Sequence, residues 1–198
     1  MSEANTEKRA VRVMMRERMA RVAGDELRKW SAAICKRLIE WPPTRDAACP
    51  MVYLPTPEEA GVDCYTAWRI ANGLTVCGPR VDWETRGMEA RVITDLQTHV
   101  EIRRHGIREP VADTGIVEAG RIDVVLTPGV AFDESGRRVG RGAGCYDRFF
   151  ARNDLMEGIL AVGVCFEAQL VESAPTEDHD VRLGAIITER RIIEPMKQ

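Results

Sequence analysis

Hydrophobic residues recur at helical spacing over the first 40 residues of the chain. Within residues 3–23, apolar side chains fall three or four positions apart and form one stripe, which comprises Val11, Met14, Met15, Met19 and Val22. This spacing predicts an amphipathic helix. A second helix is predicted over residues 25–40, and we expect Pro42 and Pro43 to end it because proline disrupts the interior of a helix.

After residue 47 the pattern changes to short, continuous apolar runs separated by turns. Strands are predicted over residues 48–55, 74–81, 122–126, 159–167 and 185–188, and helices over 65–71 and 145–153. Continuous apolar runs are typical of strands buried on both faces, which are usually parallel and joined by helices. The pattern therefore predicts an α/β fold, as one three-layer domain with a mainly parallel open sheet. Residues 82–121 are polar and irregular, and we expect loops or a peripheral hairpin that covers part of a site.

Composition narrows the class of protein. A chain of 198 residues suits a single domain over residues 1–198. The formal net charge of -3 provides no basic field, so nucleic acid is not an expected partner. No segment approaches the roughly 20 apolar residues of a membrane span, and the first residues lack the apolar core of a secretory signal. We therefore expect a cytoplasmic protein without a membrane partner, as a monomer or a weak dimer.

The six cysteines are widely spaced and include no C-x-x-C pair, which argues against a zinc or redox centre. Most lie in apolar runs, so we expect reduced, buried thiols. Cys145 has no histidine near it in the sequence, and no G-x-S-x-G motif occurs. Nucleophilic hydrolysis therefore lacks support.

The strongest chemical signal is a glycine-rich loop after the predicted strand at 122–126. The loop contains three arginines and three glycines, namely Arg137, Arg138, Arg141, Gly140, Gly142 and Gly144. Glycine permits positive φ angles, so several N–H groups can point at one anion, and guanidinium groups bind phosphate through paired hydrogen bonds. The loop is neither a Walker A motif nor a dinucleotide fingerprint, and a tight surface turn would explain the glycines alone. The arginines and the helix predicted from residue 145 favour nucleotide phosphates.

Asp147 and Asp180 are candidate magnesium ligands. Magnesium takes one or two carboxylates and completes its octahedron with water and phosphate oxygens, so two aspartates from distant segments would suffice. The alternatives are a helix cap or an ion pair with Arg148 or Arg152 for Asp147, and a capping role in a turn for Asp180.

Basic residues on the first predicted helix form a second candidate anion site. Lys8 and Arg12 are four positions apart, so their side chains stack on one face and could hold a polyanion, with Arg9 beside them. The same residues could simply be the solvated face of the helix or contact a membrane surface.

Several motifs together resemble the 5-formyltetrahydrofolate cyclo-ligase family, also called 5,10-methenyltetrahydrofolate synthetase. They are K-x-x-x-R from Lys8, YLP from Tyr53 with Glu59 after it, PRV from Pro79, EP from Glu109, DVVLTPGVAFDESGRRVGRGAGCYDRFF from Asp123, and AVGVCFEAQLVESAPTEDHD from Ala161. They cover most of the chain in the family's order. The resemblance implies a fold similar to ribose-5-phosphate isomerases and CoA transferases. It also implies that ATP and Mg²⁺ are used to convert 5-formyltetrahydrofolate, a reduced folate, to 5,10-methenyltetrahydrofolate, with release of ADP and phosphate.

The resemblance also implies roles for individual residues. ATP phosphates would be held by Lys8, Arg9, Arg12, Arg138, Gly140, Arg141, Gly142 and Gly144. Folate would be contacted by Leu54, Glu59, Arg141, Cys145 and Tyr146. Tyr146 would border both ligands, and Arg141 and Tyr146 would be catalytic. Asp147 and Asp180 would bind magnesium, and Glu59 would accept hydrogen bonds from the pterin.

Three positions depart from the family pattern. Ala60-Gly61-Val62 replaces a hydrophobic-Asp-Thr run, Cys145 replaces an aromatic residue, and Gly78 replaces an apolar one. Two alternatives to the cyclo-ligase reaction follow. One is a divergent ATP-binding relative that acts on another formyl or pterin-like compound, and the other is a non-catalytic ligand-binding protein of the same fold.

Overall fold

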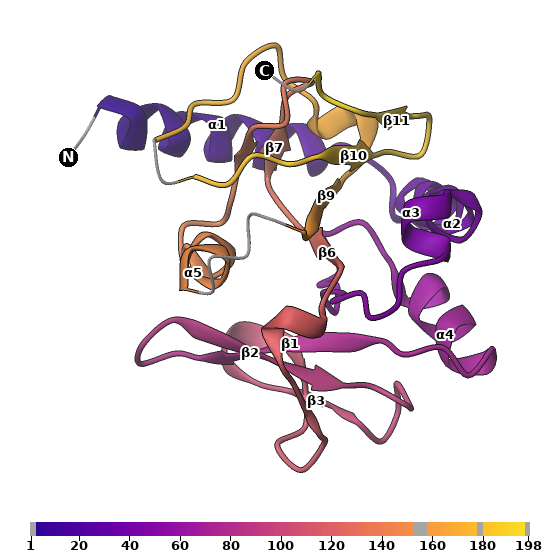
Figure 1. Ribbon diagram of the computed structural model, residues 1–198. Coiled ribbons are helices and arrows are strands. Elements are labelled where there is room, and N and C mark those ends of the chain that lie inside the picture. Colours follow the sequence, from indigo (N-terminus) through magenta and orange to yellow (C-terminus); the bar gives the residue numbers. More distant parts are fainter. Residues whose placement is uncertain (1–2, 153–157, 178–179, 197–198) are drawn as a thin grey trace.

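The computed structural model describes residues 3–152, 158–177 and 180–196, and it consists of a mixed sheet with helices on both sides (Figure 1). The helices are α1 (Glu3–Met19), α2 (Gly24–Glu40), α3 (Pro42–Arg45), α4 (Asp63–Ala71) and α5 (Cys145–Arg152), with short 3-10 turns at Arg104–Gly106, Ala119–Arg121 and Glu167–Gln169. The helices predicted at 3–23, 25–40 and 65–71 are confirmed within a few residues. The helix predicted over 145–153 ends at Arg152 in the described part, and Asn153 lies outside it.

Parallel strands form one half of the main sheet. Strand β6 (Val124–Thr127) pairs with β9 (Leu160–Val164), β9 pairs with β10 (Ala185–Ile187), and both pairings are parallel. The edge strand β11 (Ile192–Ile193) is antiparallel to β10. The predicted runs at 122–126, 159–167 and 185–188 therefore supply the parallel strands.

Antiparallel strands form the other half of the sheet. They are β1 (Cys77–Asp82), β2 (Gly87–Val92) and β5 (Ile116–Val117), in the order β1-β2-β5. Below them in Figure 1, β3 (Val100–Ile102) pairs with β4 (Arg108–Pro110) in a separate hairpin. The prediction of a mainly parallel sheet is thus corrected to a mixed one. The reason is that residues 82–121, predicted to be loops or a hairpin, return along β1 through short turns and cannot pair in parallel.

A short segment around Met51 joins the two halves of the sheet, since Pro50 and Val52 exchange backbone hydrogen bonds with Cys77. Met51 forms parallel bridges with Cys77 on β1 and with Val125 on β6. Its N–H donates to the carbonyl of Val124, and its own carbonyl accepts from the N–H of Leu126. The strand predicted over 48–55 is therefore reduced to one bridging residue.

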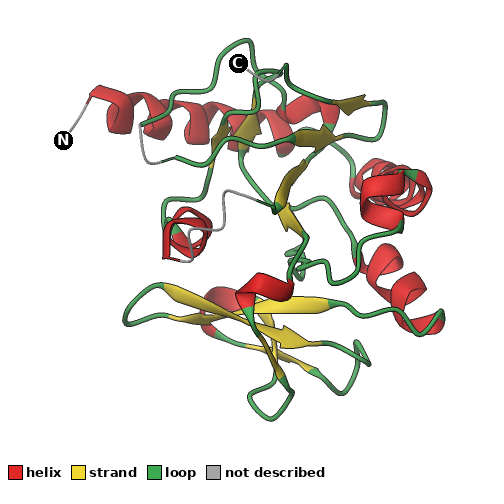
Figure 2. Cartoon of the chain, in the orientation of Figure 1, coloured by secondary structure: helices red, strands yellow, loops and turns green. Residues whose placement is uncertain are grey.

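Side chains of the parallel strands alternate between two hydrophobic clusters. Leu126, Val162 and Ile187 pack with Ile34 and Tyr65 of α2 and α4 on one side. On the other side, a second cluster contains Val125, Ala161, Ile186, Phe149 and Phe150, and the two phenylalanines belong to α5. Because successive side chains of a strand point to opposite faces, this half of the sheet is covered on both, as the continuous apolar runs predicted. Figure 2 shows the helices flanking the strands accordingly.

A second hairpin organises the glycine-rich loop. Strands β7 (Ala131–Phe132) and β8 (Arg138–Val139) are antiparallel, and the turn between them is built around Asp133, which is 2% exposed. Asp133 Oδ1 accepts hydrogen bonds from the N–H and hydroxyl of Ser135 at 2.9 and 2.6 Å and from the N–H of Arg137 at 3.2 Å. Asp133 Oδ2 accepts one from the N–H of Ala174 at 2.8 Å. This carboxylate therefore fixes where Arg138 and the following loop begin.

Arg69 on α4 is buried in the core and donates hydrogen bonds to backbone carbonyls of neighbouring segments. It is 1% exposed, and its guanidinium donates to the carbonyls of Thr75 at 2.8 Å, Ala47 at 2.7 Å and Thr44 at 3.3 Å. The guanidinium also lies 5.9 Å from the ring centroid of Tyr65. Arg69 thus fastens α4 to the segment after α2.

We expect Arg69→Met to lower the free energy of unfolding by about 3 kcal/mol, because the carbonyls of Ala47 and Thr75 lose the guanidinium donor and that of Thr44 keeps only the Tyr65 hydroxyl. Urea unfolding followed by circular dichroism measures the change. Arg28→Met is the matched control, since Arg28 pairs with Asp25 on the exposed surface of α2 and such pairs contribute less than about 1 kcal/mol. Equal effects of the two substitutions would contradict the structural role of Arg69.

Candidate active site

A cavity of about 700 Å³ lies between α1, the glycine-rich loop and the antiparallel strands. Its lining combines charged groups from distant parts of the sequence with an apolar surface from the strands. We call Lys8, Arg12, Arg138 and Arg141 the basic wall. We call Pro79, Val81, Trp83, Met88, Ile107, Arg108 and Glu109 the strand wall.

Helix α1 supplies two cations of the basic wall. Lys8 is 7% exposed, and its Nζ lies 2.5 Å from Asp180 Oδ2 and 3.0 Å from Glu177 Oε2. Burial acts to lower the pKa of Lys8, but the hydrogen bonds to the two carboxylates outweigh it, so the pKa is raised and the ammonium is charged at neutral pH. Arg12 Nε donates to the carbonyl of Gly140 at 2.8 Å, which ties α1 to the glycine-rich loop.

The glycine-rich loop has the backbone geometry that its sequence predicts at two of three glycines. Gly142 and Gly144 have φ angles of 109° and 67°, which non-glycine residues rarely adopt. Gly140 lies outside the set of positive-φ residues, and its carbonyl binds Arg12. The loop leads directly into α5, whose first residue is Cys145.

Arg138 is the most buried guanidinium of the basic wall. It is 6% exposed, its Nη2 donates to Asp147 Oδ1 at 2.8 Å, and it lies 5.6 Å from the ring centroid of Tyr146. Its Nε is buried without a hydrogen-bond partner among the described residues. A buried, unpaired N–H is costly, so this side chain is poised for an acceptor that arrives from the cavity.

Arg141 connects the basic wall to a carboxylate at the centre of the cavity. Its Nε lies 3.2 Å from Glu59 Oε1, and its Nη2 donates to Thr56 Oγ1 at 2.8 Å. Glu59 Oε2 accepts from the N–H and the hydroxyl of Thr56 at 2.9 and 3.0 Å. The side chain of Glu58 is 86% exposed, and its Oε2 lies as far as 3.9 Å from Arg141 Nη2. This exposed ion pair therefore contributes little to the arrangement.

Two tyrosines beside Glu59 are held in their neutral form. Burial, reinforced by the negative charge of Glu59, raises the pKa of Tyr146, and the same causes raise the pKa of Tyr53. The Tyr53 hydroxyl donates to the carbonyl of Ala60 at 2.5 Å. Tyr146 lines the cavity, so its protonated hydroxyl is available as a hydrogen-bond donor there.

Asp147 and Asp180 lie close together although 32 positions separate them. The link is Val181, which follows Asp180 and donates its N–H to Asp147 Oδ1 at 3.3 Å. Asp180 Oδ2 also accepts the N–H of Glu177 at 2.7 Å. The described residues contain no group of three or more His, Cys, Asp or Glu side chains that could hold a metal. Two carboxylates still match the donor set of a magnesium ion that completes its shell with water and phosphate.

The strand wall is organised around Glu109 of β4, which is 1% exposed. Its carboxylate accepts from Arg103 Nη1 at 2.8 Å, from the N–H of Val81 at 3.1 Å and from Trp83 Nε1 at 3.3 Å. These bonds hold the indole of Trp83 in the lining of the cavity. Trp83, Arg108 and Glu109 were not predicted as site residues, and only the E-P motif at Glu109 hinted at one of them.

Some residues that the sequence suggested lie outside this lining. Arg9 is exposed on α1, and Arg137 does not line the cavity although it adjoins Arg138. Among the residues predicted for ligands, the basic wall, Gly140, Gly142, Gly144, Leu54, Glu59, Cys145, Tyr146, Asp147 and Asp180 all line it. The structure thus brings together every predicted site residue except Arg9.

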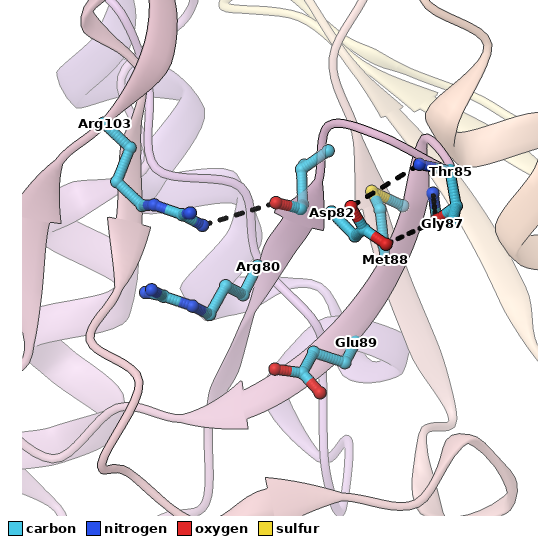
Figure 3. Close-up of a pocket in the computed structure, with 8 residues that line it drawn as sticks. Arg80, Asp82, Thr85, Gly87, Met88, Glu89 and Arg103 are labelled. Atoms are coloured by element: carbon cyan, nitrogen blue, oxygen red, sulfur yellow. Dashed lines mark hydrogen bonds between the residues drawn. The ribbon is translucent and has the colours of Figure 1, made fainter.

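A smaller cavity of about 450 Å³ opens on the other face of β1 and β2 (Figure 3). Arg80 and Arg103 point into it, but Arg80 is paired with Glu101 at 2.7 Å and Arg103 with Glu109. Asp82 accepts hydrogen bonds from Thr85 within the β-turn. The charged side chains that line this smaller cavity are therefore engaged in ion pairs and hydrogen bonds that hold the antiparallel strands together.

Comparisons with known proteins identify the family of the chain. The model of the 5-formyltetrahydrofolate cyclo-ligase family matches residues 4–189. The chain therefore belongs to that family. A 5-formyltetrahydrofolate cyclo-ligase from Escherichia coli is 38% identical over 99 residues, which span 50% of this chain and 54% of that protein. A probable 5-formyltetrahydrofolate cyclo-ligase from Schizosaccharomyces pombe is 24% identical over 94% of this chain and 97% of its own length.

Solved structures of cyclo-ligases share the fold. The 5,10-methenyltetrahydrofolate synthetase of Aquifex aeolicus aligns with a TM-score of 0.80 at 22% identity, over 96% of this chain and 94% of that one. The Mycoplasma pneumoniae synthetase aligns with a TM-score of 0.70 at 20% identity, over 95% and 99%. At this identity the likeness supports the α/β fold of the family with its mixed sheet.

The departures from the cyclo-ligase pattern fall in different environments. Ala60 and Val62 are buried in the core, and Gly61 donates its N–H to Ser31 Oγ at 3.0 Å, so none of the three lines the cavity. A side chain at Gly78 would come within 2.8 Å of Ile93, which accounts for glycine there. Cys145 alone lines the cavity, and burial raises the pKa of its thiol. It is therefore protonated at neutral pH and unsuited to act as a nucleophile.

We expect Lys8→Met to lower the free energy of unfolding by about 1–3 kcal/mol at pH 7, because it leaves Asp180 and Glu177 without their cation. Since the folded-state pKa of Lys8 is raised above 10.5, this contribution is fully present below pH 10.5 and is lost as pH rises through the folded-state value. Urea titrations of both proteins between pH 7 and 11.5 test this. A stability difference that vanishes already by pH 9 would contradict the buried ion pair.

Proposed function

We propose that the protein catalyses the ATP-dependent cyclisation of 5-formyltetrahydrofolate to 5,10-methenyltetrahydrofolate, with release of ADP and phosphate. The observation that carries the proposal is that one cavity is lined both by Arg138, whose buried Nε has no hydrogen-bond partner in the described part of the chain, and by the acceptor Glu59. The first suits a phosphate oxygen, and the second suits the hydrogen-bond donors of a pterin. Family membership supplies the reaction that uses both ligands.

The chemistry explains why both sites are needed together. A formamide oxygen is a poor leaving group, so the γ-phosphoryl group of ATP is transferred to the formyl oxygen and ADP leaves. N10 of the folate then attacks the formyl carbon and gives up its proton, the carbon–oxygen bond breaks, and the phosphate departs with that proton as hydrogen phosphate. Such transfers depend mainly on positioning and on neutralising charge.

The residues of the basic wall would provide that neutralisation. Lys8, Arg12, Arg138 and the backbone of Gly140, Gly142 and Gly144 would bind the phosphates, with Arg9 at the exposed edge. Arg141 would stabilise the transferred phosphoryl group, since it belongs to the glycine-rich loop and its side chain reaches Glu59. Tyr146 would donate its protonated hydroxyl between the two ligands. Arg141 and Tyr146 are thus the proposed catalytic residues.

Folate would lie against Leu54, Cys145 and Glu59. The two oxygens of Glu59 are oriented by Thr56 and Arg141, so the carboxylate is fixed before a pterin arrives. Such preorganisation lowers the entropy cost of binding. We further propose that Asp147 and Asp180 hold magnesium, which would add positive charge at the phosphates.

The remaining proposals rest on the resemblance and on composition. They are a single domain over residues 1–198, a fold related to ribose-5-phosphate isomerases and CoA transferases, a cytoplasmic location, a monomer or weak dimer, and no nucleic-acid partner. No helix in the described residues is long and apolar enough to cross a membrane.

A second candidate function is the same phosphoryl chemistry on another formyl or pterin-like compound. One observation favours it: Cys145, a departure from the family pattern, lies in the cavity lining. A thermal-shift screen distinguishes the two, because a ligand that binds only the folded state raises the melting temperature. Stabilisation by ATP but not by reduced folates would favour the second candidate.

The direct test mixes the protein with ATP, magnesium and 5-formyltetrahydrofolate and follows the absorbance of the methenyl product. We expect product formation that requires all three components. Absence of product from a folded protein that binds ATP would refute the proposed reaction.

We expect Arg141→Ala to lower kcat/KM by about 10²- to 10³-fold while leaving the melting temperature nearly unchanged, because a half-exposed guanidinium contributes charge stabilisation more than packing. Steady-state kinetics with the same assay measure the effect. Arg137→Ala is the matched control, since Arg137 belongs to the same segment but lies outside the cavity lining. Unchanged turnover in Arg141→Ala would remove this residue from the catalytic role.

A further inference from the structure

One cation in the cavity lies outside the basic wall. Arg108 belongs to β4 in the strand wall, and its side chain is 29% exposed. In Figure 1 the hairpin of β3 and β4 lies at the bottom of the molecule, whereas α1, which carries Lys8 and Arg12, lies at the top. The cavity therefore contains positive charge on two opposing sides.

The guanidinium of Arg108 is held in place by one of its nitrogens, Nη2. Its Nη2 donates to both carboxylate oxygens of Asp63, at 2.8 Å each. Nε and Nη1 of Arg108 make no hydrogen bond with the described residues. Asp63 is the first residue of α4, where the helix dipole favours a negative charge, so the pair is anchored on a rigid element. An anchored guanidinium with unused donors is suited to bind a second carboxylate.

The surroundings of Arg108 match the middle and the tail of a folate. The neighbouring strand wall offers Ile107, Pro79 and the indole of Trp83, an apolar surface suited to an aromatic ring. A folate has its reactive formyl group on the pterin, an aminobenzoyl ring next, and glutamyl carboxylates at the far end. Phosphate must meet the formyl end, so the carboxylates must point away from the basic wall.

We propose that Arg108 binds a carboxylate of the glutamyl tail of the folate substrate and so sets the preference of the enzyme for folates over pterins that lack the tail. This inference rests on the proposed function, and it assigns a specificity role to a residue outside the family motifs. Arg108 is a binding residue here and takes no part in the phosphoryl transfer.

The test compares 5-formyltetrahydrofolate with 5-formyltetrahydropteroate, which lacks the glutamyl group, in the wild type and in Arg108→Ala. We expect the substitution to raise KM for the folate about 10- to 100-fold, the range lost with a charge-assisted hydrogen bond. KM for ATP and for the pteroate compound should stay within about threefold. Quenching of tryptophan fluorescence by each compound measures binding independently of turnover.

Two control variants separate tail binding from a structural role. Asp63→Asn removes the charge of the partner and keeps Arg108, so it should retain the discrimination between folate and pteroate. Arg45→Ala removes another arginine from an ion pair, with Asp46 on the exposed surface of the chain, and should change neither KM. Loss of discrimination in Asp63→Asn as large as in Arg108→Ala, with the melting temperature lowered in both variants, would show that the pair acts through the fold and would overturn the proposal.

The outcomes also distinguish this proposal from the proposed function. If the wild type forms product but Arg108→Ala affects the folate and pteroate compounds equally, the tail assignment is wrong and the reaction stands. If the wild type forms no product yet Arg108→Ala selectively weakens folate binding, the assignment stands and the reaction is wrong. Failure of the wild type to bind either compound would overturn both.

Discussion

The buried ion pair between Lys8 and Asp180 is the interaction on which the arrangement of the site depends. It joins the first helix to a segment 172 positions later in the chain, and its nitrogen–oxygen distance is 2.5 Å. Asp180 is followed by Val181, which is bound to Asp147, and Asp147 in turn holds Arg138. A continuous chain of contacts therefore runs from α1 to β8 and α5. Together with the bond from Arg12 to the carbonyl of Gly140, it fixes the cations of α1 relative to the glycine-rich loop.

Most charges in the cavity are paired before any ligand binds. Arg12 donates a hydrogen bond to the carbonyl of Gly140, and Arg138 and Arg141 form ion pairs with Asp147 and Glu59 respectively. Fixed groups of this kind need little reorganisation when a charged ligand arrives, which is the main requirement for electrostatic catalysis. The arrangement also explains how several cations can lie close together in a protein with a formal net charge of -3.

The sequence predicted the basic wall well and the strand wall poorly, for physical reasons. Glycines and arginines in one short loop leave a local signal, and positive φ angles at Gly142 and Gly144 bear it out. Trp83, Arg108 and Glu109 lie in strands or turns of only a few residues, where no periodicity can develop.

The sheet, too, could be predicted only where a local sequence pattern marks it. Its parallel half could be predicted from continuous apolar runs, because both faces are buried. The bridge at Met51 could not, because pairing between distant strands depends on tertiary contacts. The role of Asp133 was also missed, since one of its four hydrogen bonds comes from Ala174, 41 positions later, and depends on tertiary contact.

The bridge at Met51 means that a backbone contact sets how the two sides of the cavity are aligned. The parallel strands lead to the glycine-rich loop, while the antiparallel half carries Trp83 and Arg108, and the bridge at Met51 sets the register of one half against the other. A shift of that pairing by one residue would displace the strand wall relative to the glycine-rich loop by about 3.3 Å. It would also reverse the faces to which the side chains point. Alignment of the two reactants is thus encoded in a main-chain contact, so a mutational survey confined to the residues around the cavity would not detect it.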